Sequence, residues 1–280
     1  MKTRWLSFGG ITIATSFEDA PSGRIIDGLC RNIPRAVDSD EPHVRFRLAQ
    51  NLSNGGFQLF LNGDLDWEAG SAPEMMTYLL DCIVYHLAAR SKGGLLLHAA
   101  SLARKGRGLL LPGASGCGKT CLTAWLICHG FDYLSDELTF IPSGTTEIQG
   151  LSRPLCIKEG AQERLEGLSL SEISCEMSTP TGGRMIISPE KISRCRILPA
   201  ADLQAIVFPH FQPSGALECY PITKAQAGLA LMTCLPNARN LPGHGFPTVS
   251  DIARRIPAFK LTYSHFNQIG ELMEKLMHLI

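Results

Sequence analysis

Alternating apolar and polar positions mark the first element that the sequence predicts. In residues 44–50, VRFRLAQ, a valine, a phenylalanine and a leucine alternate with other residues, and residues 56–63, GFQLFLNG, repeat a strand-like pattern. A period of two is typical of a strand with one buried face, and an Asn-Gly pair between two such runs favours a tight turn. We therefore expect a β-hairpin with its turn at Asn54 and Gly55.

Helical spacing begins with residues 71–90, SAPEMMTYLLDCIVYHLAAR. Apolar side chains recur there every three or four positions, Ser71 is a suitable N-cap, and Pro73 fits the first turn. The pair Gly93-Gly94 lies where such a helix would stop. An amphipathic helix is the expected structure of this segment.

The rest of the chain alternates between the two patterns. Apolar runs predict strands over residues 95–103, 108–112, 131–137, 201–209 and 258–264. Helical spacing predicts helices over residues 119–129, 223–235 and 264–280. We expect Pro209 to end its strand and Gly130 to cap its helix. The sequence therefore predicts an α/β protein with a mixed β-sheet and flanking helices over residues 93–280. A β-rich segment with one helix is expected over residues 1–92.

Composition limits the partners and the location of the protein. The 280 residues include 26 basic and 26 acidic side chains, so no net field draws the chain toward nucleic acid or a membrane surface. The apolar runs are too short to span a membrane and no signal peptide is recognisable, which favours a cytoplasmic protein. The ten cysteines include no CxxC pair, so reduced core thiols are expected. Any anion must be bound by a local site.

The segment PGASGCGKT, residues 112–120, has the pattern of such a site. Its spacing is GxxxxGK followed by threonine, the phosphate-binding loop of proteins that hydrolyse or transfer nucleotide phosphates. Glycines let the backbone approach phosphates closely, so that successive amides and the N-terminus of the next helix point at the anion. The predicted nucleotide-binding residues are Gly113, Ala114, Ser115, Gly116, Cys117, Gly118, Lys119 and Thr120. The alternative is a glycine-rich turn that binds nothing.

The last two residues of the motif have distinct predicted roles. The Lys119 ammonium would reach the β- and γ-phosphates, and the Thr120 hydroxyl would ligate Mg²⁺. ATP and Mg²⁺ are therefore the expected ligands, although the motif does not distinguish ATP from GTP or pyrophosphate.

An acidic pair ends the next predicted strand. Asp136 and Glu137 come 17 residues after Lys119, which is one helix and one turn away. A strand that follows its helix so closely is expected to lie beside the loop strand, with its terminal acids near the magnesium site. A carboxylate there would bind the metal or take a proton from an attacking hydroxyl. The alternative is a pair of solvated acids.

His98 lies on the strand before the loop, between Leu97 and Ala99. A histidine inside an apolar strand is either an ordinary core residue or, if the hairpin of residues 95–112 brings it beside the acids, a catalytic one. The pattern leaves both interpretations open.

The run from Leu95 to Ile141 resembles the catalytic core of the HPr kinase/phosphorylase family and its HPr-kinase-related kinases. The shared features are a histidine on a strand, a tight turn, the phosphate loop, a helix ending in glycine, and a strand closing on an acidic pair. The resemblance implies the nucleotide-binding fold that this family shares with phosphoenolpyruvate carboxykinases, and assembly into symmetric homo-oligomers. It also implies that His98 lies near the acceptor site. Asp136 and Glu137 match two aspartates of the family, one of which is the base while the pair holds metal.

Departures from the family pattern bear on the substrate. Residues 150–190 contain no match to the EIRGxG-like segment that supplies another metal-binding glutamate in HPr kinases. Residues 152–160, SRPLCIKEG, are instead similar to the related kinases, so we expect neither HPr as the acceptor nor a phosphorylase activity. By residue type and by this resemblance, Arg153, Lys158 and Arg184 are candidate sources of additional positive charge.

The leading hypothesis is an Mg-ATP-dependent kinase that transfers the γ-phosphoryl group to a serine-like hydroxyl of a peptide, protein or small molecule. Asp136, assisted by His98, is the predicted base, and Lys119 neutralises the developing charge. Thr120, Asp136 and Glu137 are the predicted metal ligands. Residues 1–92 would then be an acceptor-recognition lobe or a β-rich cover. The alternatives are a nucleotide-dependent peptide-binding or regulatory module with little transfer, and a simple nucleotide-hydrolysing protein.

Overall fold

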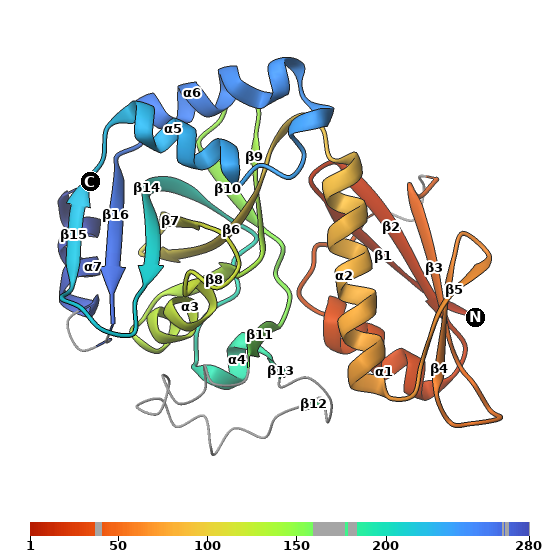
Figure 1. The fold of residues 1–280 in the computed structure, drawn as a ribbon. Helices are drawn as coiled ribbons and strands as arrows, with labels where there is room; N and C mark the ends of the chain where they lie inside the picture. Colours follow the sequence, from red (N-terminus) through yellow and green to blue (C-terminus); the bar gives the residue numbers. More distant parts are fainter. Residues whose placement is uncertain (37–40, 159–176, 179–183, 265, 267–268, 280) are drawn as a thin grey trace.

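The computed structural model is an α/β protein with several sheets and, in its described part, seven α-helices (Figure 1). It describes residues 1–36, 41–158, 177–178, 184–264, 266 and 269–279. The N-terminal part of the chain forms a five-stranded sheet, and the remainder forms an eight-stranded sheet and a small three-stranded one.

The N-terminal sheet has the strand order β1-β2-β3-β4-β5. Its strands are β1 (Lys2–Phe8), β2 (Ile11–Phe17), β3 (Val44–Gln50), β4 (Phe57–Leu61) and β5 (Asp64–Ala69). β3 and β4 pair antiparallel on either side of a turn with Gly55 at φ 72°, which confirms the predicted hairpin. Helix α1 (Ala20–Cys30) connects β2 to the parallel strand β3, and α2 (Ala72–Arg90) follows β5.

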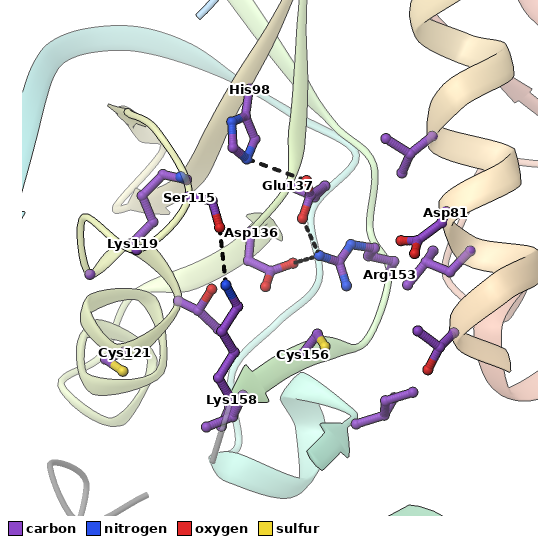
Figure 2. A pocket seen from close by; sticks show the side chains of 18 residues that line it. Asp81, His98, Ser115, Lys119, Cys121, Asp136, Glu137, Arg153, Cys156 and Lys158 are labelled. Carbon is purple, nitrogen blue, oxygen red and sulfur yellow. Dashed lines mark hydrogen bonds and ion pairs between the residues drawn. The ribbon is translucent and has the colours of Figure 1, made fainter. Parts of the chain in front are cut away.

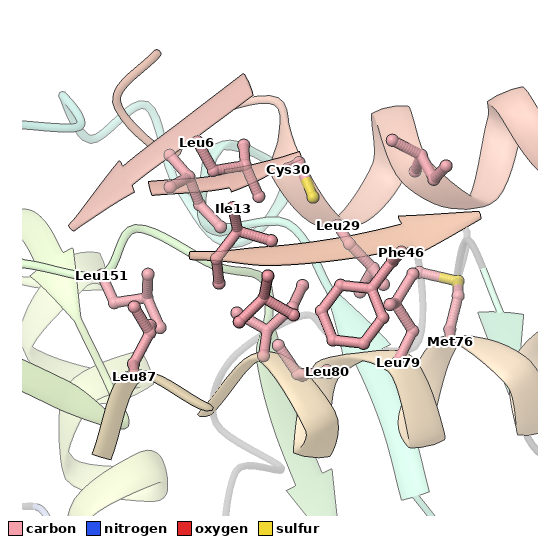
Figure 3. Close-up of a cluster of buried hydrophobic side chains, with 14 of the residues drawn as sticks. Leu6, Ile13, Leu29, Cys30, Phe46, Met76, Leu79, Leu80, Leu87 and Leu151 are labelled. Atoms are coloured by element: carbon pink, nitrogen blue, oxygen red, sulfur yellow. The ribbon is translucent and has the colours of Figure 1, made fainter. Parts of the chain in front are cut away.

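An apolar core lies between this sheet and its two helices (Figure 3). Leu6, Ile13 and Phe46 come from the strands and are at most 3% exposed. They belong to one apolar cluster with Leu79 of α2. Helix α2 begins directly after Ser71, which is its N-cap as predicted. The same cluster contains side chains from the larger sheet, so α2 is packed between the two parts of the chain.

Helix α1 was not among the elements that the sequence predicted. Its residues, APSGRIIDGLC, include two glycines, which lower the intrinsic preference for helix. The helix forms nevertheless because Asp19 caps it, accepting a hydrogen bond from the Ser22 amide at 2.7 Å. Burial of Ile25 and Ile26 in the core adds the tertiary packing that overrides weak local propensity.

The larger sheet has the order β10-β9-β6-β7-β14-β16-β15, with β8 paired to β6. Its strands are β6 (Gly94–Arg104), β7 (Arg107–Pro112), β8 (Asp132–Ser135), β9 (Leu138–Pro142), β10 (Glu147–Gly150), β14 (Ala200–Phe211), β15 (Glu218–Pro221) and β16 (Ala258–Tyr263). β7, β14 and β16 are parallel to one another. Because β10 also pairs with β14, the strands β10, β9, β6, β7 and β14 form a closed ring.

Helices cover both faces of this sheet. In β7, Leu109 and Leu111 belong to the apolar cluster under α3 and α7, whereas Leu110 belongs to the cluster under α5 and α6. The helices are α3 (Lys119–Cys128), α4 (Pro189–Ile192), α5 (Lys224–Thr233), α6 (Phe246–Arg255) and α7 (Ile269–Leu279). The three-stranded sheet, with β11 (Leu155–Lys158), β12 (Met177–Ser178) and β13 (Arg184–Ile187), has its first strand against α3.

Two expectations about the larger sheet are wrong. The strand before the acidic pair, β8, does not lie beside the loop strand β7 but pairs antiparallel with β6, because β6 and β14 occupy both edges of β7. The strand expected to stop at Pro209 continues to Phe211. β7 pairs with β14 only as far as Ile206, so the absent amide of Pro209 costs no hydrogen bond to β7.

The cysteines in the described part of the chain are free thiols; Cys30, Cys121 and Cys234 are buried core residues as the sequence predicted, whereas the other six are only partly buried. Cys175 lies outside the described residues. In the same part of the chain, no helix has both the length and the apolar character needed to cross a bilayer.

Asn237 fixes the link between α2 and β6 through buried hydrogen bonds. Its Oδ1 accepts from the Leu96 amide at 3.0 Å, and its Nδ2 donates to the carbonyls of Ser91 at 3.2 Å and Gly94 at 3.0 Å. Ser91 follows α2, and its hydroxyl donates to the Gly9 carbonyl at 2.7 Å. The link between α2 and β6 is therefore fixed both to the β1–β2 turn and to the segment after α5.

Replacing Asn237 with alanine is expected to lower the free energy of unfolding by about 2–4 kcal/mol, because the Leu96 amide and the Gly94 carbonyl lose these buried hydrogen bonds and the Ser91 carbonyl keeps only the one from Asn240. Urea unfolding followed by circular dichroism measures the change. Asn240→Ala is the matched control: Asn240 also donates to the Ser91 carbonyl but is less buried, so its loss should cost less than about 1.5 kcal/mol. Equal losses in the two variants would contradict the role assigned to Asn237.

Candidate functional site

A cavity of about 560 Å³ lies between the glycine-rich loop of residues 113–120 and helix α2 (Figure 2). It is lined by most of the residues that the sequence analysis singled out: His98, Ser115, Gly116, Gly118, Lys119, Thr120, Asp136 and Glu137. Of the other predicted residues, Gly113 and Ala114 contact Lys119 through their carbonyls, and Cys117 lies in the same loop. The loop and the acidic pair, although on strands that are not neighbours, therefore share one cavity.

Gly118 is the residue at which the loop turns into α3. Its φ of 100° is in the left-handed region that glycine adopts readily, and it is the N-cap of the helix. A Cβ added at this position would lie 2.3 Å from Tyr263 Oη. That hydroxyl donates to the Gly118 carbonyl at 3.0 Å, and the Phe211 amide donates to the Cys117 carbonyl at 3.0 Å. The ends of β14 and β16 thus hold the loop in place.

Lys119 is the first residue of α3, and its side chain folds back onto the loop. It is 6% exposed, and Nζ donates to the carbonyls of Gly113 at 2.7 Å and Ala114 at 3.0 Å. Both acceptors are neutral, so they leave the charge of the ammonium uncompensated. The first amides of α3, which have no acceptor within the helix, add further positive potential. This end of the cavity favours an anion.

The acidic pair lies in the turn between β8 and β9. The Ser135 hydroxyl accepts hydrogen bonds from the amides of Glu137 and Leu138, both at 3.2 Å, which fixes the turn. The side chain of Asp136 is 0% exposed and that of Glu137 is 30% exposed. The turn thus directs one buried and one partly exposed carboxylate toward the cavity.

Arg153 pairs with both carboxylates. Its Nη2 lies 3.4 Å from Asp136 Oδ1 and also contacts Glu137 Oε2. The Tyr133 hydroxyl lies 2.8 Å from the Arg153 carbonyl and 3.3 Å from Asp136 Oδ1, which ties the group to β8. Because its side chain is only 5% exposed, Arg153 is a fixed counter-ion of the acidic pair.

The two carboxyl groups differ in pKa. Burial raises the pKa of Asp136, an effect that the Arg153 charge opposes and the Glu137 charge reinforces. Burial also raises the pKa of Glu137, but hydrogen bonds and charges from His98 and Arg153 outweigh it and lower that pKa to about 2. Asp136 Oδ2 is buried and makes no hydrogen bond to any described residue. Asp136 is therefore the stronger base, and Glu137 is the ionised partner of Arg153 and His98.

His98 contacts the acidic pair from β6. Its Nε2 lies 3.3 Å from Glu137 Oε1, and its backbone bonds to Cys234 and Gly113. The contact is with Glu137, whereas the sequence hypothesis had His98 assisting Asp136. In this position His98 can orient Glu137 and, through it, Arg153.

Helix α2 forms a wall of the cavity that the sequence analysis missed. Thr77, Asp81 and Val84 line the cavity together with Leu80. Their spacing of three or four residues puts them on one face of the helix, which is the signal that could have identified them. Of these four residues the sequence analysis places only Leu80 on the apolar face of the helix, because the sequence does not show that α2 packs against the larger sheet.

The three residues that the sequence offers as additional positive charges, Arg153, Lys158 and Arg184, have different surroundings. Arg153 belongs to the acidic pair, and Lys158 Nζ donates to Ser115 Oγ at 3.1 Å. The backbone of Arg184 pairs with Lys158 between β13 and β11, but its side chain lies outside the described residues.

The cavity offers few ligands to a divalent cation. In the described part of the chain, no group of three or more histidine, cysteine, aspartate or glutamate side chains is arranged to hold a metal. Thr120 and Asp136 line the same cavity, and Asp136 Oδ2 is a buried oxygen without a partner among the described residues. This set fits Mg²⁺, which commonly takes one or two protein oxygens and completes its coordination with water and substrate phosphates.

Comparisons with known proteins find similarity among solved structures but not among family profiles or curated proteins. Among solved structures, the HPr(Ser) kinase/phosphatase from Coxiella burnetii is similar with a TM-score of 0.32 and 14% sequence identity. The match covers 66% of this chain and 94% of that one.

Replacing Gly118 with alanine is expected to lower the free energy of unfolding by about 2–4 kcal/mol, because strain at positive φ adds to the collision with Tyr263. Denaturant unfolding measures the loss. Gly130→Ala is the control, since φ there is 84° but an added Cβ meets nothing within 4 Å. Strain alone should cost that variant about 1–2 kcal/mol. If the two variants lose the same stability, Tyr263 does not constrain the loop.

Proposed function

We propose that this protein is an Mg-ATP-dependent kinase that transfers the γ-phosphoryl group to a serine-like hydroxyl of a peptide, protein or small molecule. The observation that carries the proposal is that one cavity is lined both by the loop entering α3 and by Asp136, whose Oδ2 is left without a partner among the described residues. One side of the cavity suits a polyanion, and the other offers a proton acceptor.

The loop would bind the phosphates of ATP. Its backbone amides, the N-terminus of α3 and the Lys119 ammonium all favour negative charge. Gly118 gives the loop the positive φ with which its backbone turns into α3. An electroneutral protein can in this way hold a triphosphate through local charge alone.

Asp136 is the proposed base. The acceptor hydroxyl oxygen would attack the γ-phosphorus, the bond from that phosphorus to the β–γ bridging oxygen would break, and ADP would leave. The hydroxyl proton would pass to Asp136 Oδ2. Burial raises the pKa of Asp136, which makes its carboxylate a better proton acceptor than an exposed aspartate.

Thr120, Asp136 and Glu137 are the residues that would hold Mg²⁺. When bound, Mg²⁺ supplies positive charge to the oxygens of the β- and γ-phosphates. Glu137 would have to exchange a contact with His98 or Arg153 to become a ligand. His98 and Arg153 act by fixing the orientation of Glu137.

A second candidate function is a nucleotide-dependent regulatory module with little phosphoryl transfer. The observation that favours it is the ion pair of Arg153 with both carboxylates, which reduces their negative charge toward a metal or a proton. Measured turnover separates the two candidates, because a module of this kind would bind the nucleotide and leave it intact.

Replacing Lys119 with alanine is expected to weaken MgATP binding by at least about 100-fold, because the ammonium that contacts the phosphates is removed. Isothermal titration calorimetry measures the affinity, and the thermal unfolding curve checks that the variant is folded. Lys105→Ala, in the β6–β7 turn outside the cavity, is the control and should bind like the unaltered protein. Unchanged affinity in Lys119→Ala would remove the nucleotide site from the loop.

Replacing Asp136 with asparagine is expected to leave MgATP binding measurable, with a smaller loss of affinity than in Lys119→Ala, because the loop, Thr120 and Glu137 remain to bind the phosphates and the metal. It should reduce ADP formation by about 100-fold or more, because the isosteric amide does not accept the proton. Single-turnover ADP formation, with water or an added hydroxyl compound as acceptor, measures the effect. Turnover that survives in the folded variant would assign the base to another residue.

A further inference from the structure

Lys158 brings a positive charge to the glycine-rich loop from another part of the fold. It is the last residue of β11, and its Nζ donates to Ser115 Oγ at 3.1 Å although the two residues are 43 positions apart. Figure 2 shows the side chain reaching toward Ser115 within the cavity that Asp136 also lines. The Lys158 ammonium therefore lies beside the loop although Lys158 is not part of the loop.

The three cations of the cavity differ in what neutralises them. Arg153 is paired with two carboxylates. Lys119 donates to two carbonyls inside the loop. Lys158 contacts a neutral hydroxyl and, among the described residues, forms no ion pair with a carboxylate. Like Lys119, it therefore keeps a charge that a ligand can use, and because Lys158 is exposed whereas Lys119 is buried, its side chain is better able to move toward that ligand.

We propose that Lys158 binds the terminal phosphate of the nucleotide and so makes the site prefer a triphosphate to a diphosphate. This inference rests on the proposed nucleotide-binding function. Asp136 must act next to the γ-phosphorus, and Arg153, five residues before Lys158, contacts Asp136. Residues 153–158 thus run from the acidic pair, which Arg153 contacts, to the loop, where Lys158 contacts Ser115. A γ-phosphate that is held by the loop and faces the acids would therefore lie near Lys158.

The chemistry of the side chain suits this role. An ammonium on a flexible four-carbon stem is a point charge with three donors, and it can leave a hydroxyl for a stronger acceptor. A hydrogen bond to a phosphate oxygen is charge-assisted and about twice as strong as one between neutral groups. The Ser115 contact holds Lys158 at the loop, and the terminal phosphate replaces that contact when a triphosphate binds. A diphosphate has no group at this position.

Isothermal titration calorimetry with MgADP and with the Mg²⁺ complex of a non-hydrolysable ATP analogue tests the proposal. Lys158→Met should lower the affinity for the triphosphate analogue by about 10- to 100-fold and the affinity for MgADP by less than about threefold. Lys158→Arg keeps the charge and should restore most of the preference for the triphosphate. Lys92→Met removes an exposed lysine outside the cavity and should change neither affinity.

The outcomes separate this inference from the proposed function. If the unaltered protein binds both nucleotides and Lys158→Met weakens neither, or weakens both equally, the role of Lys158 is overturned and the nucleotide site stands. If the unaltered protein binds neither nucleotide, the proposed function fails and this role fails with it. Lys158 is exposed, and an unchanged circular dichroism spectrum of Lys158→Met shows that a loss of affinity does not come from unfolding.

Discussion

The buried contact of Arg153 with Asp136 and Glu137 is the interaction on which the cavity depends. A guanidinium that is 5% exposed requires charged partners, and loss of either carboxylate would leave charge uncompensated in the interior. The groups come from the β8–β9 turn and from the segment before β11, so their pairing fixes these two segments relative to each other. Tyr133 and His98 attach the same network to β8 and β6.

This network makes the two acids unequal. Glu137 is held by His98 and Arg153, which keep it ionised, whereas Asp136 is more deeply buried and keeps one oxygen without a partner among the described residues. Two neighbouring carboxyl groups in different environments are a common way to divide roles in a catalytic site. In our proposal Asp136 takes the proton while Glu137 maintains the geometry, so the glutamate side chain at position 137 is compatible with transfer.

Local elements and the loop motif could be predicted from the sequence because each depends on neighbouring residues. The hairpin around Gly55, the cap at Ser71 and the left-handed Gly130 all follow from local preferences, and the structure confirms them. The position of β8 next to β6 could not be predicted, because it depends on which strands occupy the edges of β7. The wall formed by α2 and the pairing of Arg153 with the acids were missed for the same reason, since both join segments distant in the sequence.

The proposed site is tested most directly by a crystal structure with Mn²⁺ and a non-hydrolysable ATP analogue, in which anomalous scattering locates the metal. We predict a triphosphate across the amides of residues 113–120, the metal beside Thr120, and Asp136 Oδ2 facing the γ-phosphate. Phosphates bound outside this cavity, or a γ-phosphate with no carboxylate near it, would contradict the proposed function.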